Sequence, residues 1–363
     1  MTSDLNVGIV GLGYWGPNLL RNALEIETLR VSAICDRDPD VLARYARRNP
    51  DVRATPDINS LLSDDKLDAV VLATPISTHY ELARRCLEAG KHVLVEKPMA
   101  ETVAHCEVLI ELAERRNLVL MPGLTYVYSP AVVAIKRMIE LNEIGDLYFG
   151  TFSRVNLGIH RSDISVVRDL APHDYSILLY WLGYPSQIRA VGRSSIVPGV
   201  LDVAFIDAMY DSGLLVHAEM SWLAPTKIRR IVLVGSSKMV VYDDTSLEQV
   251  RVFDRGVDVI EPKDFGEFQL AYRSGDILSP RLEPDEPLGI ELLDFADSIR
   301  EGREPRATTT MGLEVVRLIE ATELSLANDG APVSLSRVDA PSLAPAIPQS
   351  NIVDIRRRVS GDR

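Results

Sequence analysis

The sequence predicts an α/β protein in which an N-terminal doubly wound parallel sheet precedes a second, α+β domain with a large, mostly antiparallel open sheet. Up to Pro122, short apolar runs alternate with helix-like stretches, which is the order that parallel pairing requires. Beyond it, residues 187–253 are mainly strand-like, with turn signals such as Asp211-Ser212-Gly213 between the runs. These observations favour two domains of different sheet type.

Local hydrophobic pattern predicts each element of the first domain. Apolar runs predict strands at residues 6–10, 29–35, 69–73, 92–95 and 118–120. Amphipathic spacing predicts helices at residues 17–26, 39–48, 79–89 and 99–116. Gly90 suits the C-terminal cap of the third helix, and Pro75 and Pro98 stop the strands that precede them.

The second domain groups its strands between helices. Helices are predicted at residues 130–141, 173–182, 289–300 and 311–327. Strands are predicted at residues 148–156, 204–210, 214–222, 228–234 and 239–242. We therefore expect an antiparallel meander covered by helices on one face.

The composition shift and the chain ends predict three segments. Residues 1–122 form the first domain, and residues 123–335 form a second domain for substrate binding and oligomerisation. Residues 336–363 contain scattered Pro and Ser, followed by Arg356-Arg357-Arg358. We expect this tail to be mobile or to pack on a partner subunit.

Composition and charge exclude several classes of protein. The chain is 46% hydrophobic and 25% charged, which is typical of a soluble globular protein, and it has no apolar run of the roughly 20 residues that span a membrane. A formal charge of −13 argues against nucleic acid or an anionic membrane as a partner. The polar start of the chain lacks a secretory signal pattern, and Cys35, Cys86 and Cys106 lack metal-ligand spacing. We expect a cytoplasmic protein without a metal site.

A glycine loop follows the first predicted strand and opens the first predicted helix. Its sequence is Gly11-Leu12-Gly13-Tyr14-Trp15-Gly16, the GxGxxG pattern of dinucleotide-binding domains. Gly11 permits the tight turn, Gly13 lets the backbone approach a pyrophosphate, and Gly16 allows close packing of helix on strand. The free amides of the helix N-terminus would hold the pyrophosphate. Within the loop, Tyr14 and Trp15 are candidate cofactor contacts.

The residue that ends the second predicted strand indicates which dinucleotide binds. Asp36 is placed to accept hydrogen bonds from the adenosine ribose hydroxyls, and its charge repels a 2′-phosphate. Arg37, directly after it, would instead suit such a phosphate. The pattern favours NAD and leaves NADP open.

Residues 73–100 read ATPISTHYELARRCLEAGKHVLVEKPMA. Together with the glycine loop, this segment resembles the Gfo/Idh/MocA family, which includes glucose–fructose oxidoreductase and inositol dehydrogenase. The resemblance extends over roughly residues 5–335 and implies a Rossmann domain with a sheet-based substrate domain. It implies that Thr74, Pro75 and His79 lie at the cofactor.

Two further patterns match the catalytic positions of the family. Glu96-Lys97-Pro98 matches its EKP motif, which implies that Lys97 touches both the nicotinamide ribose and the substrate. Asp169 and His173 match its catalytic aspartate and histidine, at a helix start. A histidine suits removal of a hydroxyl proton, and Lys97 would hydrogen-bond the alcohol oxygen. Which of Lys97 and His173 is the formal base stays open.

Asp169 and His173 are four residues apart, so on a helix they would share one face and the carboxylate would orient the imidazole. Pro172 would then lie in the first turn, where proline is tolerated. Alternatively, Asp169 is a helix N-terminal cap. Many relatives have an aspartate three residues after the histidine, where this chain has Ser176 and instead has Asp174 directly after it. Many also carry a basic residue in the stretch that here reads Gly123 to Pro130.

These departures leave the expected hydride chemistry intact, but they put in doubt that the substrate is that of the best-known family members. Residues 169–183 more nearly resemble relatives associated with bacterial sugar and sugar-nucleotide metabolism. Candidate substrate contacts are Tyr126, Arg154, Asn156 and Arg168. Of these, Arg154 and Arg168 would suit a diphosphate or a carboxylate.

The sequence therefore predicts an NAD-dependent oxidoreductase acting on a secondary ring alcohol or ketone of a sugar, nucleotide-sugar or cyclitol. A homodimer or homotetramer through the open sheet is expected by analogy with the family. Two alternatives stay open: an enzyme that uses bound NAD transiently to eliminate or hydrolyse a glycoside, and a non-catalytic dinucleotide-sensing regulator. The presence of Lys97, Asp169 and His173 argues against the regulator.

Overall fold

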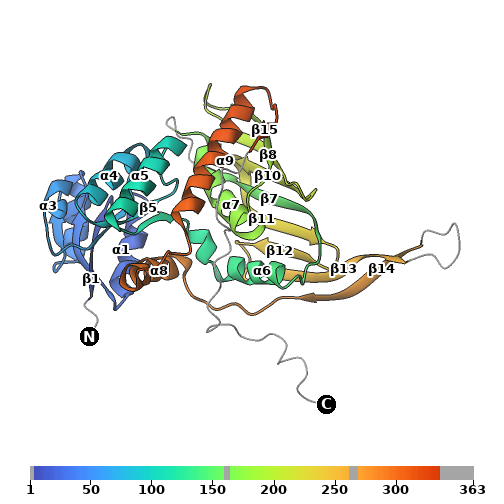
Figure 1. Ribbon diagram of the computed structural model, residues 1–363, viewed down its shortest axis with the longest axis horizontal. Helices are drawn as coiled ribbons and strands as arrows, with labels where there is room; N and C mark the ends of the chain where they lie inside the picture. The colour runs from blue at the N-terminus through green and yellow to red at the C-terminus, as the bar shows by residue number, and fades with distance from the viewer. Residues whose placement is uncertain (1–3, 159–163, 261–268, 336–363) are drawn as a thin grey trace, which may run out of the picture.

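Two sheets, each with its own covering helices, make up the molecule (Figure 1). The computed structural model describes residues 4–158, 164–260 and 269–335, so the predicted tail 336–363 lies outside the described residues. The predicted fold class, a parallel doubly wound sheet followed by a mostly antiparallel one, is confirmed. No helix of the described part is long and apolar enough to cross a membrane.

The N-terminal sheet is parallel, with strand order β3-β2-β1-β4-β5-β6 in the described part of the chain. Its strands are β1 (Leu5–Val10), β2 (Leu29–Cys35), β3 (Arg53–Thr55), β4 (Ala69–Leu72), β5 (His92–Glu96) and β6 (Leu120–Gly123). The chain crosses from one side of β1 to the other between β3 and β4. Ligands of such sheets bind at that switch point, beyond the carboxyl ends of the strands.

Helices cover both faces of this sheet: α1 (Gly16–Glu25), α2 (Pro39–Arg48), α3 (Ile58–Leu62), α4 (His79–Glu88) and α5 (Val103–Arg116). The pattern did not predict β3 and α3, which are short and mostly half-exposed. Helix α5 begins at Val103 rather than at residue 99, because Thr102 caps it by accepting from the amide of His105. Met99 and Ala100 are buried before the helix starts.

The second sheet has the order β14-β13-β12-β11-β7-β10-β9-β8-β15 in the described residues. Its strands are β7 (Leu147–Leu157), β8 (Gln187–Arg193), β9 (Val203–Met209), β10 (Leu215–Ser221), β11 (Leu223–Gly235), β12 (Met239–Asp243), β13 (Val250–Ile260), β14 (Gln269–Leu278) and β15 (Val333–Ser334). The expected simple meander is wrong, because β7 lies between β10 and β11. Consequently β7 and β10 are parallel, whereas the other described neighbours are antiparallel.

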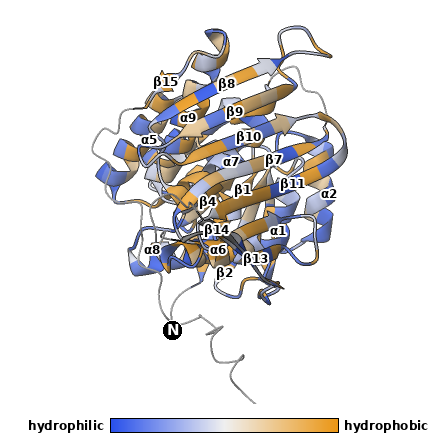
Figure 2. Ribbon diagram, turned by 90° about the vertical axis from the view of Figure 1, so that its right-hand side faces the viewer, coloured by the Kyte–Doolittle hydropathy of each residue, from blue (hydrophilic) through white to orange (hydrophobic). Residues whose placement is uncertain are grey.

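Helices lie on one face of this sheet, as predicted, while the other face is open (Figures 1 and 2). They include α6 (Pro130–Glu140), α7 (Val166–Leu182) and α9 (Thr309–Ala327). Along β9 the side chains alternate, so that Ala204, Ile206 and Ala208 are buried and Phe205 is exposed. The sheet therefore forms its core against the helices alone.

Helix α7 begins seven residues earlier than the pattern predicts, at Val166 rather than at His173. Ser165 is its N-terminal cap and accepts from the amide of Arg168, so the proposed capping role of Asp169 is wrong. Val166 and Val167 are fully buried and anchor the added turns. Pro172 therefore lies inside the helix rather than in its first turn.

The last two long helices return to the N-terminal sheet. Helix α8 (Pro287–Glu301) packs on α1, and α9 packs on β6 and α5 (Figure 1). One cluster of buried apolar side chains includes residues of both sheets, among them Ile9 of β1, Phe152 of β7 and Ile231 of β11. The two halves are therefore held together by a shared core rather than by a flexible linker.

Candidate active site

The glycine loop has the backbone geometry that its three glycines predict. Gly11 has a φ of +90°, and a Cβ on it would lie 2.6 Å from the carbonyl oxygen of Ala73. A Cβ on Gly16 would lie 1.8 Å from the carbonyl oxygen of Gly11. Gly13, in contrast, has open space around it. The loop therefore packs tightly on the protein at both ends and leaves its middle free for a ligand.

Helix α1 begins at Gly16 with Trp15 as its N-cap, and no side chain caps it. Its first amides are thus available to an anion, as a pyrophosphate site requires. Tyr14 is 93% exposed and Trp15 is 37% exposed, so both aromatic rings stand at the surface of the loop. Burial raises the pKa of Glu96, whereas Trp15 lies close enough to the carboxylate of that residue to lower it, with a smaller effect.

Asp36 directly follows β2 and binds the backbone of the glycine loop. Its Oδ2 accepts from the amide of Leu12 at 2.6 Å, and its Oδ1 accepts from the amide of Asp38 at 2.9 Å. The carboxylate therefore lies beside the loop, and its contact with the adenosine ribose stays a prediction. Arg37 is exposed and has no ion pair among the described residues.

The segment after β4 carries Thr74, Pro75 and His79. Thr74 and Pro75 line the site cavity described below, whereas His79 does not. The imidazole of His79 is buried, with Nε2 2.8 Å from the carbonyl oxygen of Thr74 and Nδ1 2.8 Å from that of Pro98. Burial lowers its pKa. His79 thus joins the ends of β4 and β5 and would act on the cofactor through them.

Lys97, at the end of β5, reaches across to α7 in the second domain. Its Nζ donates to the carbonyl oxygen of Asp169 at 2.9 Å and lies 3.8 Å from Asp169 Oδ1. Trp222 donates its indole N–H to Asp169 Oδ2 at 3.1 Å. The expected contact of Asp169 with His173 is not formed; the carboxylate is directed instead at Lys97 and Trp222.

His173 lies one turn further along α7. Its ring is perpendicular to that of Tyr126, with centroids 5.1 Å apart. Burial lowers the pKa of His173 well below its usual value, and the charges of Lys97, Arg154 and Arg229 act in the same direction. The imidazole is therefore neutral near pH 7 and can accept a proton.

Arg154 and Asp174, the residue directly after His173, form a buried ion pair. Arg154 Nε and Nη2 lie 2.8 and 2.7 Å from Asp174 Oδ1, and both side chains are only 4% exposed. Asp174, which departs from the pattern of many relatives, thus neutralises Arg154. Ser176, the other departure, donates to the carbonyl oxygen of His173 at 2.7 Å.

Arg229 stands directly opposite Arg154 on the neighbouring strand. Tyr126 lies between the two guanidinium groups, and its hydroxyl oxygen accepts from Arg154 at 3.1 Å and from Arg229 at 3.0 Å. Arg229 also pairs with Asp244 Oδ2 at 3.0 Å. Each arginine therefore has its own carboxylate, and Tyr126 joins the two pairs.

A single cavity of about 890 Å³ connects these groups. Its lining includes Gly13, Tyr14, Trp15, Thr74, Pro75, Glu96, Lys97, Tyr126, Arg154, Asn156, Asp169, His173, Arg229 and Asp244. Arg168 is not part of the lining. It pairs with Glu323 at 2.6 Å and donates to the carbonyl oxygen of Glu101 at 2.9 Å, so the structure places it in a contact between helices.

Sequence reasoning missed Arg229, Asp244 and Trp222. For Arg229 a signal existed, because it falls in the same alternation phase as Ile231 and Leu233, which are buried. A charged residue in the inward phase of a strand marks a site or a buried ion pair. Asp244 and Trp222 carry no such signal, since their neighbours depend on the order of the strands.

Comparison with known proteins supports the same assignment. Residues 5–124 match the GFO_IDH_MocA model, described as "Oxidoreductase family, NAD-binding Rossmann fold", and residues 132–241 match the "GFO/IDH/MocA C-terminal domain". D-apiose dehydrogenase of Paraburkholderia graminis is 25% identical over 96% of this chain and 94% of its own length. Glycosyl hydrolase family 109 protein 2 of Shewanella sp. (strain ANA-3) is 34% identical, over 40% of this chain and 34% of its own length.

Among solved structures, levoglucosan dehydrogenase in complex with NADH and levoglucosan is similar in fold. Its TM-score is 0.77 at 22% identity, covering 92% of this chain and all (100%) of that one. The two family models together match more than half of the chain, one for each sheet. The chain therefore belongs to the Gfo/Idh/MocA family of NAD-dependent oxidoreductases.

Proposed function

We propose that this protein transfers a hydride between NAD and a secondary ring alcohol or ketone of a sugar, nucleotide-sugar or cyclitol. The observation that carries the proposal is the single cavity that joins the glycine loop to Lys97, Asp169 and His173. The loop residues would hold the cofactor, whose nicotinamide supplies the hydride acceptor or donor. The side chains from α7 and β7 would hold the ring that reacts.

The protein's own side chains would remove the proton of the substrate hydroxyl. A neutral His173 can accept it, while the ammonium group of Lys97 donates a hydrogen bond to the same oxygen and stabilises developing negative charge. Asp169 holds Lys97 through its backbone carbonyl oxygen, 2.9 Å away. This hydrogen bond would keep the side chain of Lys97 directed into the cavity, next to His173.

Substrate orientation would come from the arginine–tyrosine group at the sheet. Tyr126, Arg154 and Arg229 bind one another and line the cavity, and Asn156 lies two residues after Arg154 on β7. Hydroxyl groups of a sugar ring suit such donors and acceptors. Because Asp174 and Asp244 neutralise the two arginines, the group favours hydrogen bonding over the capture of a bare anion.

A second function, in which NAD is used transiently to cleave a glycoside, is favoured by one observation. The relative with 34% identity is named as a glycosyl hydrolase, although it matches only 40% of this chain. Both functions would use the same cofactor end of the cavity. They differ in whether reduced cofactor accumulates.

We also propose a homodimer or homotetramer formed through the open face of the second sheet. Four large apolar side chains on adjoining strands are 42–48% exposed: Val191, Phe205, Leu215 and Phe149. Leu215 pairs with Phe149, and Val191 pairs with Phe205 across the strands. Figure 2 shows apolar and polar residues alternating along these strands. Polar residues, among them His217 and Asp207, lie between the two pairs. Exposed apolar pairs on an open sheet face suit association with another copy.

The test is a panel of free sugars, cyclitols, nucleotide-sugars and aryl glycosides, assayed with NAD and with NADP. We expect reduced NAD to accumulate with at least one polyol, and kcat to fall by about a hundredfold or more in Lys97→Ala, as for loss of a positioned acid–base group. NAD binding should stay largely intact in that variant. Release of aglycone without net reduction would support the glycosidase alternative, and near-normal turnover of Lys97→Ala would refute the role of the lysine.

A further inference from the structure

The imidazole of His173 is not oriented by a hydrogen bond from the described residues. In that part of the chain, no hydrogen bond or ion pair reaches either ring nitrogen. Asp169, which was expected to orient the ring, contacts Lys97 and Trp222 instead. A general base is usually held by a third group in the orientation that its reaction requires. The orientation of His173 therefore depends on the side chains that pack against it.

Tyr126 makes a T-shaped ring contact with His173. The two ring planes meet at 70°, and the ring centroids are 5.1 Å apart. This separation lies within the range of about 4.5–7 Å that T-shaped aromatic pairs prefer. Both rings line the cavity, so the contact is formed where the substrate would react.

The hydroxyl of Tyr126 uses each of its hydrogen-bonding positions within the protein. A phenol offers one proton and two lone pairs. The lone pairs accept from Arg154 at 3.1 Å and from Arg229 at 3.0 Å, and the proton is donated to Asp244 Oδ2 at 3.3 Å. The guanidinium group of Arg154 also lies over the ring, with its Cζ 4.7 Å from the centroid. The hydroxyl therefore fixes the ring of Tyr126 and leaves the arginines to bind a sugar hydroxyl.

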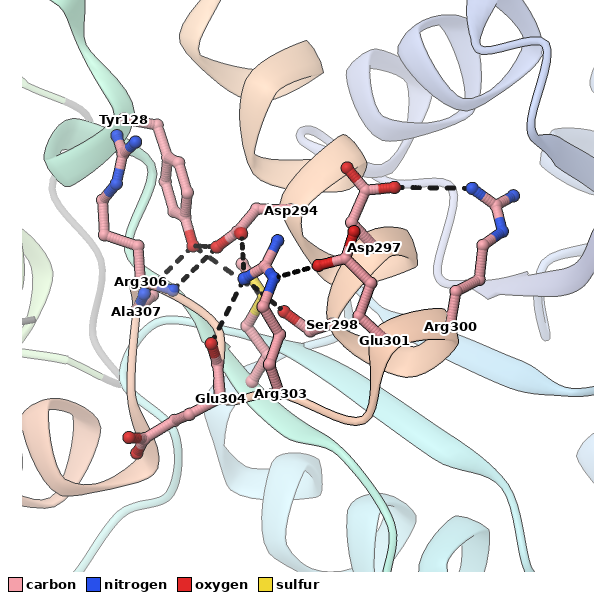
Figure 3. Close-up of polar contacts among 11 residues, drawn as sticks. Tyr128, Asp294, Asp297, Ser298, Arg300, Glu301, Arg303, Glu304, Arg306 and Ala307 are labelled. Carbon is pink, nitrogen blue, oxygen red and sulfur yellow. Dashed lines mark hydrogen bonds and ion pairs between the residues drawn. The ribbon is translucent and has the colours of Figure 1, made fainter. Parts of the chain in front are cut away.

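The backbone that carries Tyr126 is fixed at both ends to helix α8. Tyr126 lies in a short 3-10 helix, η2 (Thr125–Tyr128). At its start, the hydroxyl of Thr125 donates to Glu291 Oε2 at 2.9 Å. At its end, the hydroxyl of Tyr128 donates to Asp294 Oδ2 at 2.7 Å (Figure 3). Because Glu291 and Tyr128 are buried, neither end can move without breaking a buried hydrogen bond.

We propose that Tyr126 is a positioning residue whose ring holds the imidazole of His173 toward the reacting hydroxyl, in place of Asp169. Its own hydroxyl, the guanidinium group over its face and the turn that carries it fix the ring, and the ring restricts rotation of the imidazole. A base held in one orientation gives the reaction the advantage of proximity. The inference rests on the proposed function, because it takes His173 to be the proton acceptor.

The first experiment separates the ring of Tyr126 from its hydroxyl. We expect Tyr126→Leu to lower kcat about thirtyfold, because a misdirected base loses the advantage of proximity. The KM for the substrate should change less than about twofold, since the lost interaction acts on the reaction and not on binding. Tyr126→Phe keeps the ring and should retain kcat within about fivefold of the wild type. Arg154 and Arg229 keep their carboxylate partners in that variant.

Tyr80→Leu is the matched control. Tyr80 stacks on His105 with ring centroids 4.0 Å apart, and neither residue lines the cavity. This variant should keep the wild-type kcat and KM. If Tyr126→Phe and Tyr126→Leu raise KM equally, the hydroxyl binds the substrate and the proposal is overturned. An unchanged kcat in Tyr126→Leu would overturn it as well.

A second measurement needs no substrate and starts from the unmodified protein. The chain has six histidines, so labelling them at Cε1 gives a simple NMR spectrum, in which the His173 signal is identified by its loss in His173→Gln. With NAD bound, this signal should show a nuclear Overhauser contact to the ring of Tyr126, shift in Tyr126→Leu and keep its place in Tyr126→Phe. Absence of that contact would refute the positioning role. A protein that shows the contact but turns over no candidate substrate would contradict the proposed function instead.

Discussion

The cofactor half and the substrate half of the cavity are built in different ways. The cofactor half consists of backbone: Gly11 to Gly16 and Asp36 lie within 26 residues, and their contacts run to main-chain atoms. The substrate half consists of side chains from β7, α7 and β11, held together by the ion pairs of Arg154 and Arg229. The cofactor half therefore depends on backbone conformation, whereas the substrate half depends on the balance of charge between its side chains.

This difference predicts where substitutions act. In the cofactor half, loss of a side chain should change which dinucleotide binds and leave the fold in place. In the substrate half, removal of one member of a buried pair leaves an uncompensated charge, which destabilises the folded protein itself. The three predictions below test that contrast, in order of decreasing effect.

Asp174→Asn should reduce the free energy of unfolding by about 3–5 kcal/mol, because it leaves Arg154 charged and buried without its partner. Denaturant unfolding of the two proteins measures the difference. Asp207→Asn is the matched control, since Asp207 pairs with His217 on the open face, where both side chains are more than 40% exposed (43% and 46%). A loss below about 1 kcal/mol for Asp174→Asn, as expected of a surface pair, would show that the buried pair is not what supports this half.

Arg229→Met should raise the KM for the substrate about twentyfold, in the range of one hydrogen bond to a charged group. The Kd for NAD should not change, because Arg229 lies in the substrate half. Arg230→Met is the control: its side chain is 50% exposed and pairs with Asp243. Steady-state kinetics on the substrate found in the panel would measure both, and equal effects of the two variants would contradict the assignment of Arg229.

Asp36→Ala should lower the preference for NAD over NADP about tenfold, through loss of the ribose contact and of the charge that repels a 2′-phosphate. Competition binding of the two cofactors measures this ratio. Asp36→Asn separates the two causes, since its side-chain amide can still hydrogen-bond a ribose hydroxyl but no longer carries the negative charge. An unchanged ratio in both variants would show that Asp36 supports the loop and does not select the cofactor.

Much of the cofactor half could be predicted from sequence, because each requirement there is local. A φ of +90° at Gly11 and the contact that Gly16 would make with Gly11 arise between residues five apart in the chain. Helix α2 also has the bounds that its pattern predicts, residues 39–48. Helix α7 does not, since its first turns are fixed by burial of Val166 and Val167 and not by their spacing.

The substrate half could be predicted only in part. The positions of Lys97 and His173 followed from the family resemblance, but their partners did not. Arg168 and Arg154 are the same residue type and both were candidates for the substrate; only Arg154 lines the cavity, while Arg168 pairs with Glu323 in α9. The distinction depends on which face of which element each one occupies after packing.

By itself, the sequence determined the two sheet types, the dinucleotide loop and most of the candidate residues that line the cavity. These features depend on periodicity, on glycine positions and on residues adjacent in the chain. Tertiary structure alone decided that Asp169 is directed at Lys97 and Trp222 and that Arg154 and Arg229 stand opposite one another. The physical reason is that strand order sets these neighbours, and β7 lies between two strands that follow it by more than fifty residues.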